Sequence, residues 1–193
     1  MKLYLIRHGE SEANRKGNHA GWAQVPLTEQ GEVDALAAGR LLKGLTFDKV
    51  YTTDLLRAIQ TGELAMPEVE KEQTPLLREI SVGTLAGKNS TQCREEYGES
   101  YISQKAAYDF TAFGGENYEM LANRVRQFLD MTASGDHACV AAFCHEGAVR
   151  TALDLVLGIR INRKTMRCDN GSVTVFEYTN DQWRLCQWNM TAL

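Results

Sequence analysis

The chain has 193 residues, 44% of them hydrophobic and 24% charged, which is ordinary for a soluble globular protein with one domain and a substantial core. Its formal net charge of −4 argues against bulk affinity for nucleic acid or an anionic membrane, which needs a basic face, so we expect neither partner. The five cysteines are scattered and form no C-x-x-C pair, so neither a disulfide framework nor a zinc site is predicted. No signal peptide or long apolar span is evident, and we expect a cytoplasmic protein.

The first half of the chain alternates between strand-like and helix-like segments. Apolar spacing and turn residues predict, in chain order, a strand at 2–6, a helix at 28–43, a strand at 48–52, a helix at 54–65 and a short extended segment at 70–74. Thr28 is the expected N-cap of the first helix, in which Gly31 is a tolerated glycine. The glycine-punctuated segment 79–87 is predicted to be a loop.

The second half predicts helices first and then a mixture of strands and a helix. The expected elements are helices at about 90–97, 101–109 and 116–133, a buried strand at 137–143, a helix at 147–157, and hairpin strands at 172–178 and 183–188. This order predicts an α/β fold: a three-layer α/β/α sandwich with a mostly parallel central sheet and an antiparallel edge. We expect a single domain over residues 1–193, with a helical cap inserted at about 88–133.

The first predicted strand ends in three residues that suggest a functional site. The apolar run Leu3–Ile6 is followed directly by Arg7, His8 and Gly9. Ligands of α/β proteins bind at the carboxyl ends of strands, and a glycine there lets another group approach the backbone. A guanidinium suits an anion such as phosphate, and an imidazole can act as a nucleophile. By itself, this tripeptide is equally compatible with surface residues at a strand end.

Further motifs accompany the tripeptide in a fixed order along nearly the whole chain. They are R-H-G-E-S-E-A-N at 7–14, G-W at 21–22, P-L-T-E-Q-G at 26–31, T-D-L-L-R-A-I-Q-T at 53–61, L-R-E-I around Glu79, G-G-E-N at 114–117 and C-H-E-G at 144–147. Each motif is weak, but the ordered set is specific. With them the chain resembles the histidine phosphatase superfamily, in its phosphoglycerate-mutase-like branch.

This resemblance implies phosphoryl transfer through a phosphohistidine. His8 would be the nucleophile, Arg7 and Arg57 would hold the equatorial phosphate oxygens, and His145 would donate to a further oxygen. No metal or cofactor is expected, because arginines and histidines supply the positive charge. Without the resemblance, His145 would be read as a core histidine and Arg57 as a solvated helix residue.

The resemblance implies roles for two more residues. Asn14 would contact the phosphate, and Glu79 would protonate the leaving alcohol and then activate water. Glu79 could instead be an ordinary loop carboxylate, and the adjacent Arg78 would keep it ionised if the two paired. We interpret His19 and His137 as structural or solvent-exposed.

Two positions depart from the family pattern. Ala20 stands where many relatives carry a hydroxyl residue, so one phosphate hydrogen bond would be missing. Glu146 stands where relatives usually have glycine or asparagine. Its carboxylate could raise the pKa of His145 and keep that ring cationic, or it could point to solvent.

Among functions, these observations favour a phosphomonoesterase acting on a small phosphorylated metabolite. Phosphoglycerate mutases carry paired arginines after the general acid, whereas the stretch 93–115 contains only Arg94 and Lys105 as cations, which would hold a bisphosphorylated cofactor poorly. A mutase is the alternative, and a catalytically silent binding or regulatory module is the second. The substrate and the oligomeric state stay open. A ring-bearing substrate is favoured if any of the aromatic side chains of the predicted cap face the site; they are Tyr97, Tyr101, Tyr108, Phe110 and Phe113.

Overall fold

In the computed structural model, which describes residues 1–163 and 165–192, the described chain forms a six-stranded sheet in the order β3-β2-β4-β1-β5-β6. The strands are β1 (Lys2–Arg7), β2 (Lys49–Thr52), β3 (Glu72–Gln73), β4 (Cys139–Cys144), β5 (Val173–Thr179) and β6 (Gln182–Met190). The first four in this order are parallel, and β5 and β6 add an antiparallel edge. The predicted sheet is confirmed.

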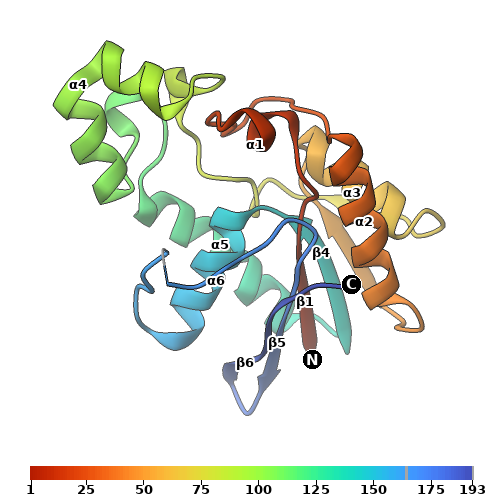
Figure 1. The fold of residues 1–193 in the computed structure, drawn as a ribbon. Helices are drawn as coiled ribbons and strands as arrows, with labels where there is room; N and C mark the ends of the chain where they lie inside the picture. The colour runs from red at the N-terminus through yellow and green to blue at the C-terminus, as the bar shows by residue number, and fades with distance from the viewer. Residues whose placement is uncertain (164, 193) are drawn as a thin grey trace.

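Helices cover both faces of this sheet (Figure 1). The described helices are α1 (Glu12–Lys16), α2 (Glu29–Leu42), α3 (Leu56–Ala65), α4 (Ser90–Ala107), α5 (Tyr118–Ser134) and α6 (Glu146–Leu157), with 3₁₀ turns η1 (Gly83–Leu85) and η2 (Thr111–Phe113). α2 and α3 lie on one face and α5 and α6 on the other, while α4 forms a cap beyond the carboxyl edge. Three layers and a cap are therefore confirmed; α1, η1 and η2 were not predicted from the sequence.

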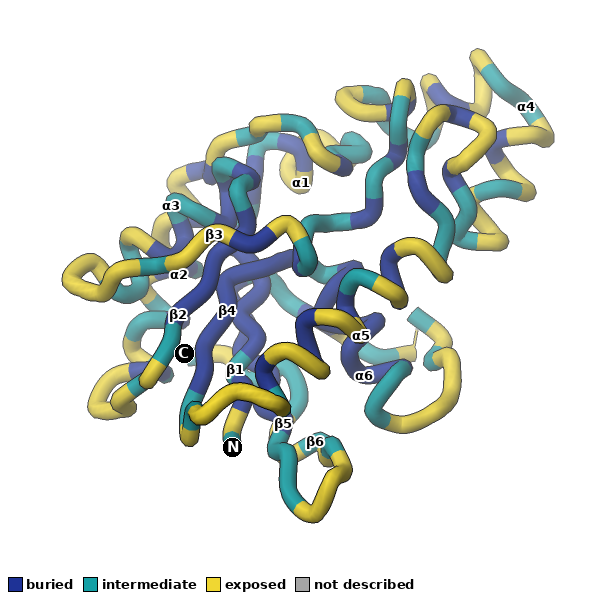
Figure 2. Tube along the Cα trace, turned by 180° about the vertical axis from the view of Figure 1, so that it is seen from behind, coloured by how far each residue is buried: buried dark blue, intermediate teal, exposed yellow. Residues whose placement is uncertain are grey.

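The alternation of side chains along β1 divides the core between the two faces. Leu3 and Leu5 belong to the apolar cluster that contains α5 residues such as Phe128, whereas Ile6 belongs to the cluster that contains Leu42 of α2. Successive residues of a strand point to opposite faces, so a strand covered on both sides must be apolar throughout. Figure 2 shows the result, with the central strands buried and most of α4 at the surface.

Strand register brings the functional motifs together. Arg7 at the end of β1 pairs with Cys144 at the end of β4, and Thr52 at the end of β2 pairs with Phe143. The residues that follow these strands therefore emerge side by side at the carboxyl edge. They are His8, Thr53 and His145.

Two glycines allow the loop after β1 to pass directly over the start of α2. Thr28 caps α2 as predicted, because its hydroxyl accepts a hydrogen bond from the backbone N–H of Gly31. A Cβ at Gly9 would lie 2.1 Å from the carbonyl oxygen of Gly31, and a Cβ at Gly31 would lie 1.9 Å from that of Glu10. Gly31 is thus required by a backbone contact, and the interpretation of it as merely tolerated is wrong.

Replacing Gly31 by alanine should destabilise the protein strongly, because the new methyl group meets rigid backbone. We expect the free energy of unfolding to fall by about 2–4 kcal/mol in urea denaturation. Gly135→Ala is the matched control: its φ is −78°, and the nearest atom to its new Cβ would be in the His137 side chain at 3.2 Å, with backbone oxygens no closer than 3.6 Å. Equal losses in the two variants would show that the Gly9–Gly31 contact is not tight.

Candidate active site

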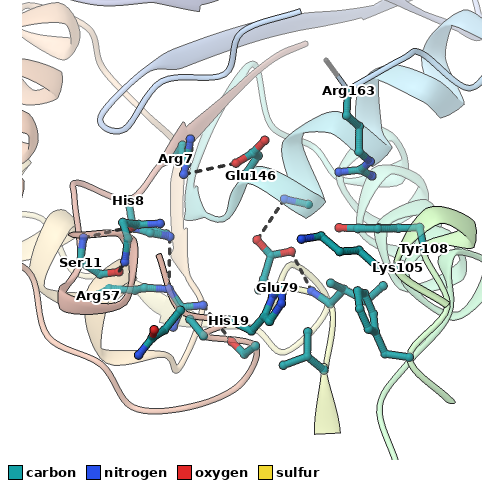
Figure 3. A pocket seen from close by; sticks show the side chains of 18 residues that line it. Arg7, His8, Ser11, His19, Arg57, Glu79, Lys105, Tyr108, Glu146 and Arg163 are labelled. Atoms are coloured by element: carbon teal, nitrogen blue, oxygen red, sulfur yellow. Dashed lines mark hydrogen bonds and ion pairs between the residues drawn. The ribbon is translucent and has the colours of Figure 1, made fainter. Parts of the chain in front are cut away.

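A cavity of about 380 Å³ opens at the carboxyl edge, between the sheet and α4 (Figure 3). The predicted site residues that line it are Arg7, His8, Asn14, Arg57 and Glu79. His145 is the exception; it is fully buried, with its ring centroid 5.1 Å from that of His8. The fold therefore gathers all six predicted residues in one place.

The hydrogen bonds of His8 define its tautomer. Its Nδ1 lies 2.7 Å from the carbonyl oxygen of Gly9, which can only accept, so Nδ1 carries the proton. The Nε of Arg57, which can only donate, lies 3.2 Å from the Nε2 of His8, so Nε2 presents a lone pair. Burial, together with the charges of Arg57 and Arg7, holds the pKa of His8 well below its usual value. The ring is neutral and its free nitrogen faces cations.

The two arginines beside His8 are buried rather than solvated. Arg57 is only 1% exposed and donates to the carbonyl oxygens of Gly21 at 2.9 Å and Ala23 at 3.1 Å. Burial lowers its pKa to about 10, so the guanidinium is still charged at neutral pH. Arg7 donates to the carbonyl oxygen of Cys168, and its Nε is buried with no hydrogen-bond partner among the described residues.

His145 also presents an unpaired nitrogen. Its Nε2 lies 2.8 Å from the hydroxyl of Thr53, while its Nδ1 is buried without a partner among the described residues. Unpaired buried polar groups are rare and costly. Two of them, Nε of Arg7 and Nδ1 of His145, belong to side chains next to His8, so polar groups beside this ring are still free to bond a ligand.

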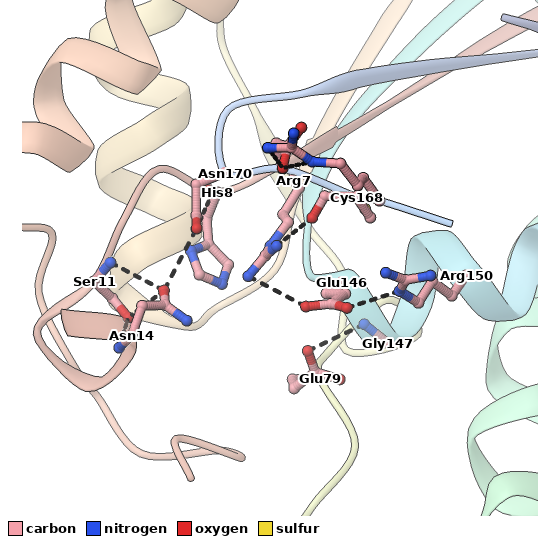
Figure 4. Close-up of polar contacts among 12 residues, drawn as sticks. Arg7, His8, Ser11, Asn14, Glu79, Glu146, Gly147, Arg150, Cys168 and Asn170 are labelled. Atoms are coloured by element: carbon pink, nitrogen blue, oxygen red, sulfur yellow. Dashed lines mark hydrogen bonds and ion pairs between the residues drawn. The ribbon is translucent and has the colours of Figure 1, made fainter. Parts of the chain in front are cut away.

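Neither expectation for Glu146 is correct. Its carboxylate is paired with Arg7 at 3.3 Å and with Arg150 at 2.7 Å (Figure 4), rather than with His145 or solvent alone. The pKa of His145 is lowered, not raised, because burial and the nearby Arg57 disfavour the cation. Glu146 thus acts on the arginine of the site and not on its second histidine.

Asn14 reaches the cavity from α1, which Ser11 and Asn14 begin with a capping box. Its Oδ1 accepts from the backbone N–H and the hydroxyl of Ser11, and Asn170 donates to the same oxygen at 3.4 Å and to the carbonyl of His8 at 3.1 Å. Because the oxygen is engaged, Asn14 can offer an anion its amide N–H. The S-x-x-N spacing could have revealed this helix; nothing in the sequence indicated Asn170.

Glu79 lies across the cavity from His8. Its carboxylate accepts from the backbone N–H groups of Ile80 at 2.8 Å and Gly147 at 3.1 Å. A Cβ at Gly147 would lie 1.9 Å from a Glu79 oxygen, so a larger residue there would displace the carboxylate from its present position. Arg78 pairs with Asp54 instead of Glu79.

The G-G-E-N motif supports the segment that carries Glu79. Glu116 pairs with Arg124 at 2.8 Å and accepts from the backbone N–H of Ser81 at 2.9 Å. Arg124 also donates to the carbonyl oxygens of Leu76 at 2.9 Å and Arg78 at 3.2 Å. The loop around Glu79 is therefore held by a largely buried ion pair.

The cavity is also lined by residues that no sequence motif assigned to the site, His19, Lys105 and Arg163, with Arg163 coming from the loop after α6. His19 was expected to be structural or exposed; it does bond to Tyr101 at 2.8 Å, but it also faces the cavity. Of the aromatic residues predicted in the cap, Tyr108 and Phe110 reach the cavity. Arg163 gave no signal because it belongs to no motif.

Two further observations concern the described residues as a whole. Nowhere in residues 1–163 and 165–192 do three or more His, Cys, Asp or Glu side chains gather as they would around a metal ion. In the same part of the chain, no helix has the length and apolar character needed to cross a membrane.

The chemistry available here is transfer of an anionic group to nitrogen. A neutral imidazole presents a lone pair beside two buried guanidinium groups. Nε of Arg7 and Nδ1 of His145 are still without hydrogen-bond partners among the described residues. A carboxylate faces this group from the opposite wall. Such an arrangement suits in-line phosphoryl transfer.

Comparisons with known proteins agree with this geometry. The family model for the histidine phosphatase superfamily (branch 1) matches residues 3–191. A 2,3-bisphosphoglycerate-dependent phosphoglycerate mutase of Parvibaculum lavamentivorans is 36% identical over 162 residues, covering 77% of this chain and 76% of that protein. One from Treponema pallidum is 43% identical over 109 residues, which cover 53% of this chain and only 43% of that protein.

Among solved structures, the alpha-ribazole phosphatase of Shigella flexneri has a TM-score of 0.89 at 25% identity, covering 98% of this chain and 96% of that one. The sequence motifs, the sheet order and the residues gathered around His8 thus agree with a family match over nearly the whole chain. This chain belongs to the histidine phosphatase superfamily.

Proposed function

We propose that the protein is a metal-independent phosphomonoesterase that hydrolyses a small phosphorylated metabolite through a phosphohistidine on His8. The observation that carries this proposal is the tautomer of His8, with a proton on Nδ1 and a lone pair on Nε2 facing Arg57. A neutral imidazole whose proton is held on the far nitrogen is ready to attack phosphorus.

In the first step, Nε2 of His8 forms a bond to phosphorus as the bond from phosphorus to the leaving oxygen breaks. Arg7, Arg57, Asn14 and His145 hold the three equatorial oxygens, whose charge rises in the transition state. Glu79, entering this step protonated, gives its proton to the leaving oxygen, and the alcohol departs.

In the second step, water attacks the phosphohistidine. Glu79, now a carboxylate, takes a proton from the water as its oxygen bonds to phosphorus, and the bond to Nε2 breaks. Inorganic phosphate and neutral His8 are regenerated. The Gly147 and Ile80 N–H groups keep the carboxylate in place for both steps.

Two observations support hydrolysis over mutase chemistry. The structural match to the Shigella phosphatase covers 98% of this chain and 96% of that one. The stretch 93–115, in which paired arginines are expected of a mutase, contains only Arg94 and Lys105 as cations. A phosphoglycerate mutase is the second candidate, favoured by the Parvibaculum relative and by Lys105 and Arg163, two cations that could hold another acidic group.

The first test is the phosphoenzyme. After rapid quench of a reaction with a labelled phosphomonoester, the protein should carry phosphate that is lost in acid. His8→Ala should lower kcat by about 10³-fold or more and abolish the label, because no other nucleophile lies at that position. His137→Ala, a half-buried histidine preceding β4, is the matched control and should behave as wild type.

Two results would contradict this assignment. One is a His8→Ala protein with wild-type turnover. The other is activity that disappears after exhaustive chelation and returns only with Mg²⁺ or Zn²⁺.

The second test is the pH dependence of kcat/KM. The pKa of His8 is lowered, so the ring stays neutral and nucleophilic as pH falls through its usual value. With activated aryl phosphates, whose phenolate leaves without a proton from Glu79, kcat/KM should change by less than about threefold between about pH 7 and about pH 5 once the ionisation of the substrate is corrected for. A histidine with an ordinary pKa of about 6.5 would lose about 25-fold over the same range. A comparison of two aryl phosphates whose phosphate groups have different pKa values distinguishes the ionisation of the substrate from that of the enzyme. An acidic limb near 6.5 with both would refute the neutral-nucleophile interpretation.

The third test distinguishes hydrolase from mutase. Phosphorus NMR can follow 3-phosphoglycerate in the presence of a catalytic amount of 2,3-bisphosphoglycerate. A hydrolase should release inorganic phosphate, if it accepts this substrate, because water takes the phosphoryl group from His8. Rapid formation of 2-phosphoglycerate with little free phosphate would replace the hydrolase assignment by the mutase.

A further inference from the structure

The far wall of the cavity carries two cations that the proposed chemistry does not use. Lys105 on α4 and Arg163 in the loop after α6 line the same cavity as His8. In Figure 3 both lie on the opposite side of Glu79 from His8, with the Tyr108 side chain between Lys105 and Arg163. They form what we call the distal wall: Lys105, Tyr108 and Arg163.

Arg163 is positioned but not neutralised. Its guanidinium lies 3.9 Å from the centre of the Tyr108 ring, a cation–π contact that fixes its orientation. Its Nη2 is buried and has no hydrogen-bond partner among the described residues. A buried donor on a permanent charge is costly unless a ligand accepts from it.

Lys105 is in a similar state. Its Nζ donates to the hydroxyl of Ser90 at 2.7 Å and lies 5.4 Å from the centre of the Tyr101 ring. Within residues 1–163 and 165–192, no carboxylate forms an ion pair with Lys105 or Arg163. In a protein of net charge −4, two unpaired cations facing one cavity indicate an anionic ligand.

The charges also argue against a ring-bearing substrate at this wall. Two aromatic residues do reach the cavity, but Arg163 covers the ring of Tyr108 and Phe110 is only 3% exposed. No bare aromatic face is therefore offered for stacking. The group that the distal wall fits is an acid, which Lys105 and Arg163 can pair with and to which the Tyr108 hydroxyl can donate.

We infer that the distal wall of Lys105, Tyr108 and Arg163 is a second anion site, and that the substrate is a phosphomonoester bearing a further acidic group, a carboxylate or a second phosphate. This inference rests on the proposed function of His8. It names the substrate class: the phosphate at His8 and the second acid at the distal wall bracket Glu79, which places the leaving oxygen beside that carboxyl.

The test compares phosphoglycolate with its carboxamide, two phosphomonoesters that differ in one negative charge. The full chain should prefer the carboxylate in kcat/KM by about tenfold or more, the size of one charge-assisted hydrogen bond. Lys105→Gln and Arg163→Gln should each reduce this preference by about tenfold, and Arg163→Lys should retain more of it than Arg163→Gln. Arg160→Gln is the matched control, because Arg160 stacks on Tyr118 at 3.9 Å and does not line this cavity.

A wild-type preference near unity, or one that the two glutamine variants leave unchanged, would overturn the second anion site. Phenyl phosphate, which has no second acid, reports separately on His8: if it is hydrolysed through a phosphohistidine, the proposed function stands even when the second site fails. If neither phosphohistidine nor turnover is found with any substrate, the proposed function fails. In that case calorimetry still tests the second anion site: the wild-type protein should bind phosphoglycolate more tightly than its carboxamide by about tenfold.

Discussion

The hydrogen bond between Nδ1 of His8 and the carbonyl oxygen of Gly9 decides what the rest of the site can do. A carbonyl cannot donate, so this contact holds the ring proton away from the cavity and leaves Nε2 as a base facing Arg57. The surrounding cations then reinforce that state, because burial among guanidinium groups disfavours a second proton on the ring. In the other tautomer, Nε2 would carry the proton and the lone pair would face away from the cavity.

That contact depends in turn on how the loop after β1 is built. Gly9 can lie against the first turn of α2 only because Gly31 also lacks a side chain. The parallel register of β1, β4 and β2 places the neighbours of His8 beside it without any help from loop conformation. The site is therefore anchored to the ends of buried strands, whereas Glu79 is carried by a loop that needs the Glu116–Arg124 ion pair to hold it.

Sequence reasoning was strongest where a residue follows a strand. The apolar runs that form β1 and β4 predicted where His8 and His145 would meet. Strands covered by helices on both faces must be apolar throughout, so both runs could be recognised as central strands. Short elements such as α1 were missed because their stability comes from a capping box and tertiary contacts rather than apolar spacing. Arg163 was missed because it belongs to no motif, and nothing in the sequence indicates that the loop after α6 lies beside the cavity. Glu146 was noticed, but its partners Arg7 and Arg150 could be identified only in space.

The ion pair between Glu146 and Arg7 means that the site contains an anion of its own. A phosphate that arrives at Arg7 exchanges with a tethered carboxylate instead of meeting an unoccupied cation, and part of the binding energy is lost in that exchange. In the hydrolysis that we propose, the same exchange would run in the opposite direction, with the Glu146 carboxylate returning to Arg7 as inorganic phosphate leaves. The residue that follows His145 would then promote release of the product as well as compete with the substrate.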